Sequence, residues 1–80
     1  MRLDKYLQTV GIFKRRTAAR EVCEEGIVEI NGHRAKSGKT VQAGDRIDLH
    51  LYNRELSIEV LRIPAGVVPK KDRPDYFRTL

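Results

Sequence analysis

The chain has a single cysteine and no long apolar run, and each of these absences excludes a class of protein. One cysteine cannot form an internal disulfide, which excludes a small secreted domain held by disulfides and favours a reducing compartment. No stretch approaches the roughly 20 apolar residues that span a bilayer. The first residues are charged rather than apolar, so we expect no signal peptide. We therefore expect a cytoplasmic protein without membrane contact.

The chain is also short, which limits the chemistry that it can support. A domain of this size buries only about 60% of the surface of its unfolded chain, and so has little room for a deep substrate cavity. Cys23, His33 and His50 lack the spacing of metal ligands. Residues 37–40 (SGKT) lack the earlier glycine and the following helix of a phosphate-binding loop. We predict a binding protein that is not an enzyme and that holds no metal or cofactor.

Positive charge is concentrated at the start of the chain, within an overall net charge of +5. Residues 1–20 hold six Lys/Arg and one Asp, whereas residues 21–63 hold six Lys/Arg and eight Asp/Glu, and residues 64–80 hold four and two. Clustering of this kind concentrates positive potential where a polyanion would dock, whereas a charge that serves only solubility needs no clustering. The first 20 residues therefore predict a surface for nucleic acid.

The apolar spacing predicts two short helices in this basic segment. Apolar residues of the segment 3–10 recur at intervals of three and four, and Gly11 is suited to end the first helix. A second helix follows the basic run 14–16, carries an apolar stripe that includes Cys23, and ends at Gly26.

Beyond the second helix the apolar period becomes alternating. Residues 27–30 and 33–35 are predicted strands joined by Asn31-Gly32, the strongest two-residue hairpin signal, because a type I′ turn needs positive φ at both positions. Residues 46–51 and 56–63 alternate polar and apolar, as half-buried strands do. We predict an α+β fold in which the two short helices pack on a small, strongly twisted antiparallel sheet.

The last part of the chain, residues 64–80, shows no period and contains all three prolines. We expect a basic, irregular and flexible tail beside a domain formed by residues 1–63. Tyr76, Phe77 and Leu80 could dock on the body of the domain or on a partner.

The basic residues of the helices and of the hairpin region are expected to share one surface. Arg2 and Lys5 fall on the polar face of the first helix, and Arg20 lies one turn after Arg16 on the second. Because Lys and Arg that bind phosphates release counterions, RNA binding should fall steeply with salt. Asp4, the one acid here, is expected either to hold Arg16 or Arg20 in place or to contact RNA. The predicted cationic contacts are Arg2, Lys5, Lys14, Arg15, Arg16, Arg20, Arg34, Lys36 and Lys39.

Three segments, in this order and spacing, resemble the S-four RNA-binding domain, also called the alpha-L motif. They are residues 2–7 (RLDKYL), 15–19 (RRTAA) and 26–32 (GIVEING), and residues 41–45 match the V-x-x-G-D turn of that family. The resemblance covers about residues 1–50, which would form the core motif of the domain. It implies that further positions face RNA, namely Asp4, Thr17, Asn31 and Gly32.

Within that family the chain resembles the stand-alone ribosome-associated quality-control P proteins, which are related to the fifteen-kilodalton heat-shock protein. The resemblance implies a monomer that binds obstructed large ribosomal subunits and contacts peptidyl-tRNA and large-subunit rRNA. It also implies that the protein assists RqcH in adding C-terminal alanine tails to stalled chains. The alternatives are a general ribosome-binding protein or RNA chaperone without a tailing role, and a catalytic module whose partner domain lies in another chain.

Overall fold

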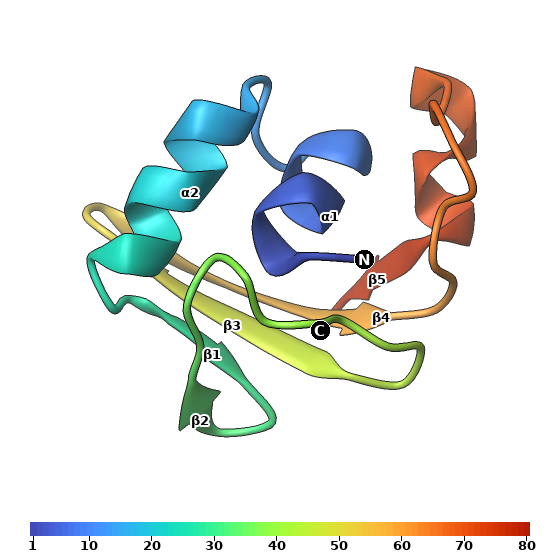
Figure 1. Cartoon of the computed structure of the whole chain (residues 1–80). Helices are drawn as coiled ribbons and strands as arrows, with labels where there is room; N and C mark the ends of the chain where they lie inside the picture. Colours follow the sequence, from blue (N-terminus) through green and yellow to red (C-terminus); the bar gives the residue numbers. More distant parts are fainter.

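The computed structural model describes residues 1–80 and has two layers, with two helices packed on one face of a five-stranded antiparallel sheet (Figure 1). The helices α1 (Leu3–Thr9) and α2 (Arg16–Glu24) contact each other, and a 3-10 helix η1 (Lys70–Asp75) lies near the end of the chain. None of the helices has the length and apolarity that a membrane span requires. The sheet has the order β2-β1-β3-β4-β5, with β1 (Val28–Ile30), β2 (His33–Arg34), β3 (Arg46–Leu51), β4 (Arg54–Val60) and β5 (Phe77–Thr79). The predicted α+β fold is confirmed.

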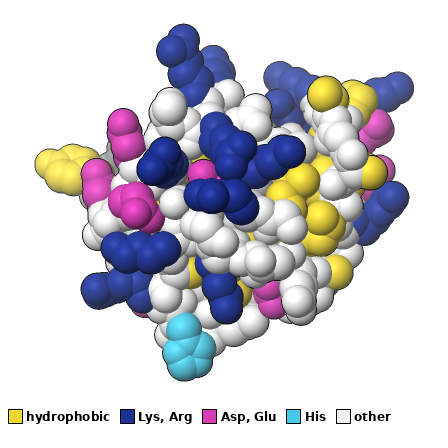
Figure 2. All heavy atoms as spheres, viewed as in Figure 1, with side chains coloured by type: hydrophobic (Ala, Val, Ile, Leu, Met, Phe, Trp, Pro, Cys, Tyr) yellow, Lys and Arg dark blue, Asp and Glu magenta, His cyan; other side chains and the backbone are white.

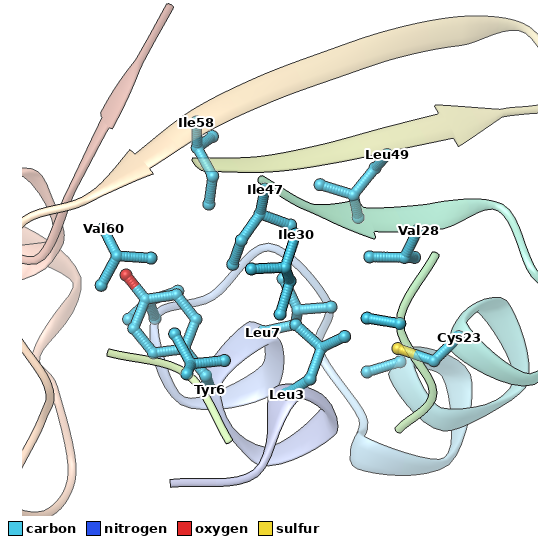
Figure 3. Close-up of a cluster of buried hydrophobic side chains, with 14 residues drawn as sticks. Leu3, Tyr6, Leu7, Cys23, Val28, Ile30, Ile47, Leu49, Ile58 and Val60 are labelled. Carbon is cyan, nitrogen blue, oxygen red and sulfur yellow. The ribbon is translucent and has the colours of Figure 1, made fainter. Parts of the chain in front are cut away.

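The helix α1 lies at the centre of the core because its apolar side chains all point into it. Leu3, Tyr6 and Leu7 have no exposed surface. Figure 3 shows them facing apolar side chains of the sheet, which include Val28, Ile30, Ile47, Leu49, Ile58 and Val60. A helix of seven residues has little stability alone, whereas each large side chain that it buries contributes about 1.5–3 kcal/mol. Packing on the sheet, rather than intrinsic helicity, therefore fixes where the start of the chain lies.

The predicted hairpin turn is confirmed by its backbone angles. Asn31 and Gly32 have φ values of 53° and 82°, as a type I′ turn requires. The Asn31 side chain donates to Asp45 at 3.1 Å and accepts from the N–H of Arg46 at 2.9 Å. The Asn31 amide therefore connects the turn to the start of β3.

The tail differs from the irregular segment that the sequence predicted, because residues 70–79 contain η1 and β5. The strand β5 pairs antiparallel with β4 and becomes an edge of the sheet. The Tyr6 hydroxyl donates to the Tyr76 carbonyl at 2.9 Å, and the Arg62 guanidinium lies 5.1 Å from the centre of the Tyr76 ring. A strand of three residues after a proline-containing 3-10 helix is too short for a period to reveal it.

Candidate nucleic-acid interface

The centre of the site is a buried carboxylate that lies between two arginines. Asp4, in the first turn of α1, is only 1% exposed. Its Oδ1 accepts from Nε of Arg2 at 3.2 Å, and its Oδ2 accepts from Nε of Arg16 at 3.3 Å. The N–H of Lys5 also donates to Oδ1, at 2.8 Å. We call Arg2, Asp4 and Arg16 the arginine clamp, because one carboxylate joins the beginnings of both helices.

The contacts of the arginine clamp keep Asp4 ionised despite its burial. Burial raises the pKa of the carboxyl. The hydrogen bonds from Arg2, from the Lys5 N–H and from Arg16 together lower that pKa by more than burial raises it, so the resulting pKa lies below the ordinary value of 3.8. At neutral pH the clamp therefore holds one negative and two positive charges.

The carboxylate orients the two arginines without using most of their donors. From each arginine Asp4 accepts only the Nε–H, whereas a guanidinium carries five N–H donors. The side chains of Arg2 and Arg16 remain 51% and 47% exposed, respectively. Their terminal amino groups are thus free for the bidentate contacts that arginine makes with phosphate oxygens.

The loop of residues 37–40 is hydrogen-bonded to the start of the chain and so lies beside Arg2. The N–H of Leu3 donates to the Lys39 carbonyl at 2.8 Å, and the N–H of Asp4 donates to the Ser37 carbonyl at 3.2 Å. The Arg2 guanidinium also lies close to Gly38, where an added Cβ would be 3.7 Å from its Cζ. This pairing places Lys39, the only cation of the loop, beside the start of α1 along the backbone.

Every predicted contact residue except Asp4 is exposed. Figure 2 shows Lys and Arg side chains gathered over the region of α1 and α2. The ion pairs of this region involve only Arg2 and Arg16, which leaves the charges of Lys5, Lys14 and Arg20 uncompensated by direct pairing. Asp4 holds Arg16, as the sequence allowed, but its second partner is Arg2 rather than Arg20.

The predicted residues of the hairpin region, except Gly32, line a separate concavity of about 610 Å³. Two of them are engaged within the chain, because the Asn31 amide contacts Asp45 and Arg46 and the Lys36 ammonium donates to the Glu24 carbonyl at 3.4 Å. The lining of this concavity includes Asn31, Arg34, Lys36 and Lys39.

Glu24 positions the loop, and the sequence reasoning did not identify it. Its carboxylate accepts from the N–H of Ser37 at 3.2 Å, and this bond holds the pKa of Glu24 below its ordinary value. The sequence did carry a signal for this contact, because an acid in the last turn of a helix interacts unfavourably with the helix dipole. The hydrogen bond to Ser37 compensates for that unfavourable interaction.

Comparisons with known proteins identify the family to which the chain belongs. Residues 1–47 match the S4 domain. The chain is 48% identical over 78 residues to the RQC P-site tRNA stabilizing factor of Helicobacter pylori, covering 96% of this chain and 93% of that protein. It is 40% identical over 80 residues to the protein of the same name from Listeria innocua, covering 100% of this chain and 85% of the relative.

A solved structure gives the same fold. The trimeric structure of Vibrio cholerae Heat Shock Protein 15 matches with a TM-score of 0.90 and 32% sequence identity, covering all of this chain and 81% of the other. The match extends through the tail, whose order the sequence did not predict. With a family match over more than half of the chain and relatives aligned over most of their own length, the chain belongs to the S4 domain family and, within it, to the RQC P-site tRNA stabilizing factors.

Proposed function

We propose that this chain is a non-catalytic RNA-binding factor of ribosome-associated quality control, which stabilises P-site tRNA on the large ribosomal subunit. The observation that carries the proposal is the arginine clamp, in which a buried Asp4 presents two half-exposed guanidiniums side by side. The names of the relatives indicate that the ligand is P-site tRNA, and the clamp is a physical means of binding it.

The clamp suits the backbone of structured RNA. The deep groove of an A-form helix hides its base edges, so proteins recognise such RNA through its shape, its phosphates and its 2′-hydroxyls. Because Asp4 already fixes the directions of Arg2 and Arg16, little side-chain freedom remains to be lost when phosphate binds. The uncompensated cations around the clamp add attraction at longer range, which falls with salt.

The finer part of the proposal concerns partners. We infer that the chain, as a monomer in the cytoplasm, contacts both large-subunit rRNA and peptidyl-tRNA on obstructed subunits while RqcH adds C-terminal alanine. The RNA contact is assigned to residues 1–63, which include the clamp and the loop 37–40. The support is geometric, since cations on both helices and on the loop offer more than one place for an RNA backbone.

The proposal is tested by sedimenting lysate that contains the tagged chain through a sucrose gradient at low salt. We expect the chain in large-subunit fractions that carry tRNA, in amounts well below one copy per ribosome. Arg16→Ala should leave these fractions, whereas the matched control Arg54→Ala should stay, because Arg54 is exposed on β4 and forms no ion pair. Absence of the unaltered chain from large-subunit fractions would refute the proposal, and near-equal amounts of chain and ribosome would favour a general ribosomal component.

A further inference from the structure

We propose that a groove between α1 and the tail binds an unstacked nucleotide of a single-stranded RNA segment that continues from the arginine clamp. The inference rests on the proposed function and extends it, because it adds a second kind of RNA contact at a place outside the clamp. The groove has a volume of about 670 Å³ and lies between α1 with the residues that follow it and the segment 65–73.

The floor of the groove is apolar and partly open to solvent. Its lining includes Phe13, the only aromatic side chain there, together with Val67 and Val68. Val67 is 95% exposed, so its side chain is open to a ligand. Figure 2 shows hydrophobic side chains gathered next to the Lys and Arg cluster, on the same face of the molecule. A nucleobase has the flat apolar faces that such a floor accommodates.

The charged residues at the rim of the groove are all cationic. Its lining contains Lys5, Lys14, Lys70 and Arg73 and no Asp or Glu. None of these four side chains forms one of the ion pairs of the structure, which lie at Asp4 and on the sheet. The backbone N–H of Lys5 donates to Asp4 at 2.8 Å, so the rim begins directly beside the clamp. An apolar floor inside an uncompensated cationic rim is the chemistry of a nucleotide, with its base on the floor and its phosphates on the rim.

The tail wall of the groove is fixed to the end of α1. Gly11 has φ of +86°, and a Cβ added there would lie 2.2 Å from Cζ of Arg73, so the arginine lies flat against the glycine backbone. The Arg73 Nε is buried there without a hydrogen-bond acceptor. The Tyr6 hydroxyl donates to the Tyr76 carbonyl at 2.9 Å and so anchors the chain just after this segment to α1. The groove is therefore preformed, which lowers the entropy lost on binding.

The test compares two labelled RNA hairpins, one blunt and one extended by unpaired adenylates at both ends, with the full chain by fluorescence anisotropy. The unaltered chain should bind the extended hairpin about tenfold more tightly, as one stacked base allows. Val67→Glu should abolish this gain while changing affinity for the blunt hairpin little, because Val67 is exposed and lies outside the clamp. The matched control is Tyr52→Glu, since Tyr52 is 105% exposed, lies outside the groove and undergoes the same change in charge.

A second readout locates the contact. On adding hexaadenylate to the ¹⁵N-labelled chain, the amide signals of Phe13, Val67 and Lys70 should shift, and those of Tyr52 should not. If the blunt hairpin binds in an Arg16-dependent manner but the extension adds nothing, the groove proposal is wrong and the proposed function stands. If neither hairpin binds, both are wrong. If the groove signals shift with an acidic peptide and not with hexaadenylate, the occupant is a protein and the proposal is overturned.

Discussion

The two faces of the molecule hold their charges in different ways. On the outer face of the sheet, residues alternate with the core positions of each strand, and acids and bases there meet along β3 and across neighbouring strands. Arg46 pairs with Asp48 at 3.2 Å, Arg78 pairs with Glu59, and His50 lies 3.2 Å from Glu55. On the helix face, one carboxylate serves two arginines and the other cations have no ion-pair partner.

The two faces therefore differ in how far ion pairs compensate their charges, and we propose that the uncompensated helix face is the one that binds RNA. Cross-strand pairs of opposite charge stabilise a sheet modestly and leave little net potential. A buried carboxylate between two arginines instead fixes the direction of an excess positive charge. The predictions below test whether the two faces differ in function as they do in electrostatics.

The largest effect is expected from removing both arginines of the clamp. Arg2→Ala combined with Arg16→Ala should weaken binding of a labelled tRNA about hundredfold, because two charge-assisted contacts are lost at about 1.5 kcal/mol each. The sheet-face double variant of Arg46→Ala with Arg78→Ala removes the same charge and should change affinity far less. Fluorescence anisotropy at fixed salt measures both, and equal losses in the two variants would mean that charge alone determines binding.

The next effect concerns stability. Asp4→Asn should lower the free energy of unfolding in urea by about 2 kcal/mol, because charge-assisted hydrogen bonds to a buried group are lost. Asp48→Asn, on the sheet face, should cost about 1 kcal/mol or less, since its arginine partner is exposed.

The effect of Asp4→Asn should also depend on pH. The pKa of Asp4 in the folded chain lies below 3.8, so the stability that its charge contributes is present above that value and is lost as the pH falls through the folded pKa. The stabilities of the unaltered chain and of Asp4→Asn should therefore approach each other in strong acid. A constant difference down to low pH would show that shape rather than charge makes Asp4 stabilising.

A smaller effect is expected where the helix face meets the tail. Gly11→Ala should lower the free energy of unfolding by about 1–2 kcal/mol, because an L-residue is strained at this positive φ and its Cβ displaces Arg73. Gly44 also has a positive φ, of +93°, but a Cβ added there would meet no atom within 4 Å. Gly44→Ala should therefore lower the free energy of unfolding by about 1 kcal/mol, from backbone strain alone. Adding Arg73→Ala to the Gly11 variant should remove the difference between the two glycines in thermal denaturation.

The smallest effect belongs to His50 on the sheet face. The hydrogen bond to Glu55 raises the pKa of His50 above its ordinary value of 6.5. The stabilising contribution is therefore complete below 6.5 and is lost as the pH rises through the folded pKa. The melting temperature of the unaltered chain should fall slightly relative to that of His50→Gln between mildly acidic and mildly alkaline pH. RNA affinity should be the same for both proteins, and a difference in affinity would argue that the sheet face also contacts RNA.

The sequence predicted the parts of the fold that have a period or a turn signal. The helical spacing around Leu3 and Leu7, the alternation in β3 and β4 and the Asn31-Gly32 turn all correspond to structure. The tail was mispredicted because β5 is stabilised by pairing with β4 and by the contact of Tyr6 with Tyr76. Pairings between residues so far apart in sequence leave no local pattern.

The candidate site was predictable in composition and only partly in arrangement. The charge cluster marked Arg2 and Arg16, and the lone acid among them suggested that Asp4 holds an arginine. That Asp4 holds both follows from the packing of α1 against α2, which brings residues 12 positions apart within hydrogen-bond distance. The contacts of the Asn31 amide within the chain were missed for the same reason, since its partners at the start of β3 are distant in sequence.

The backbone pairing between the first four residues and the loop 37–40 has a consequence for fragments of the protein. The N–H of Val41 donates to the Met1 carbonyl at 2.9 Å, which continues the pairing of Leu3 with Lys39. A peptide of residues 1–20 would keep six of the cations but none of the surroundings that aim them. Such a peptide should attract any polyanion weakly and without preference, and on the ribosome that makes this chain, selective binding can arise only after residue 41 has left the exit tunnel.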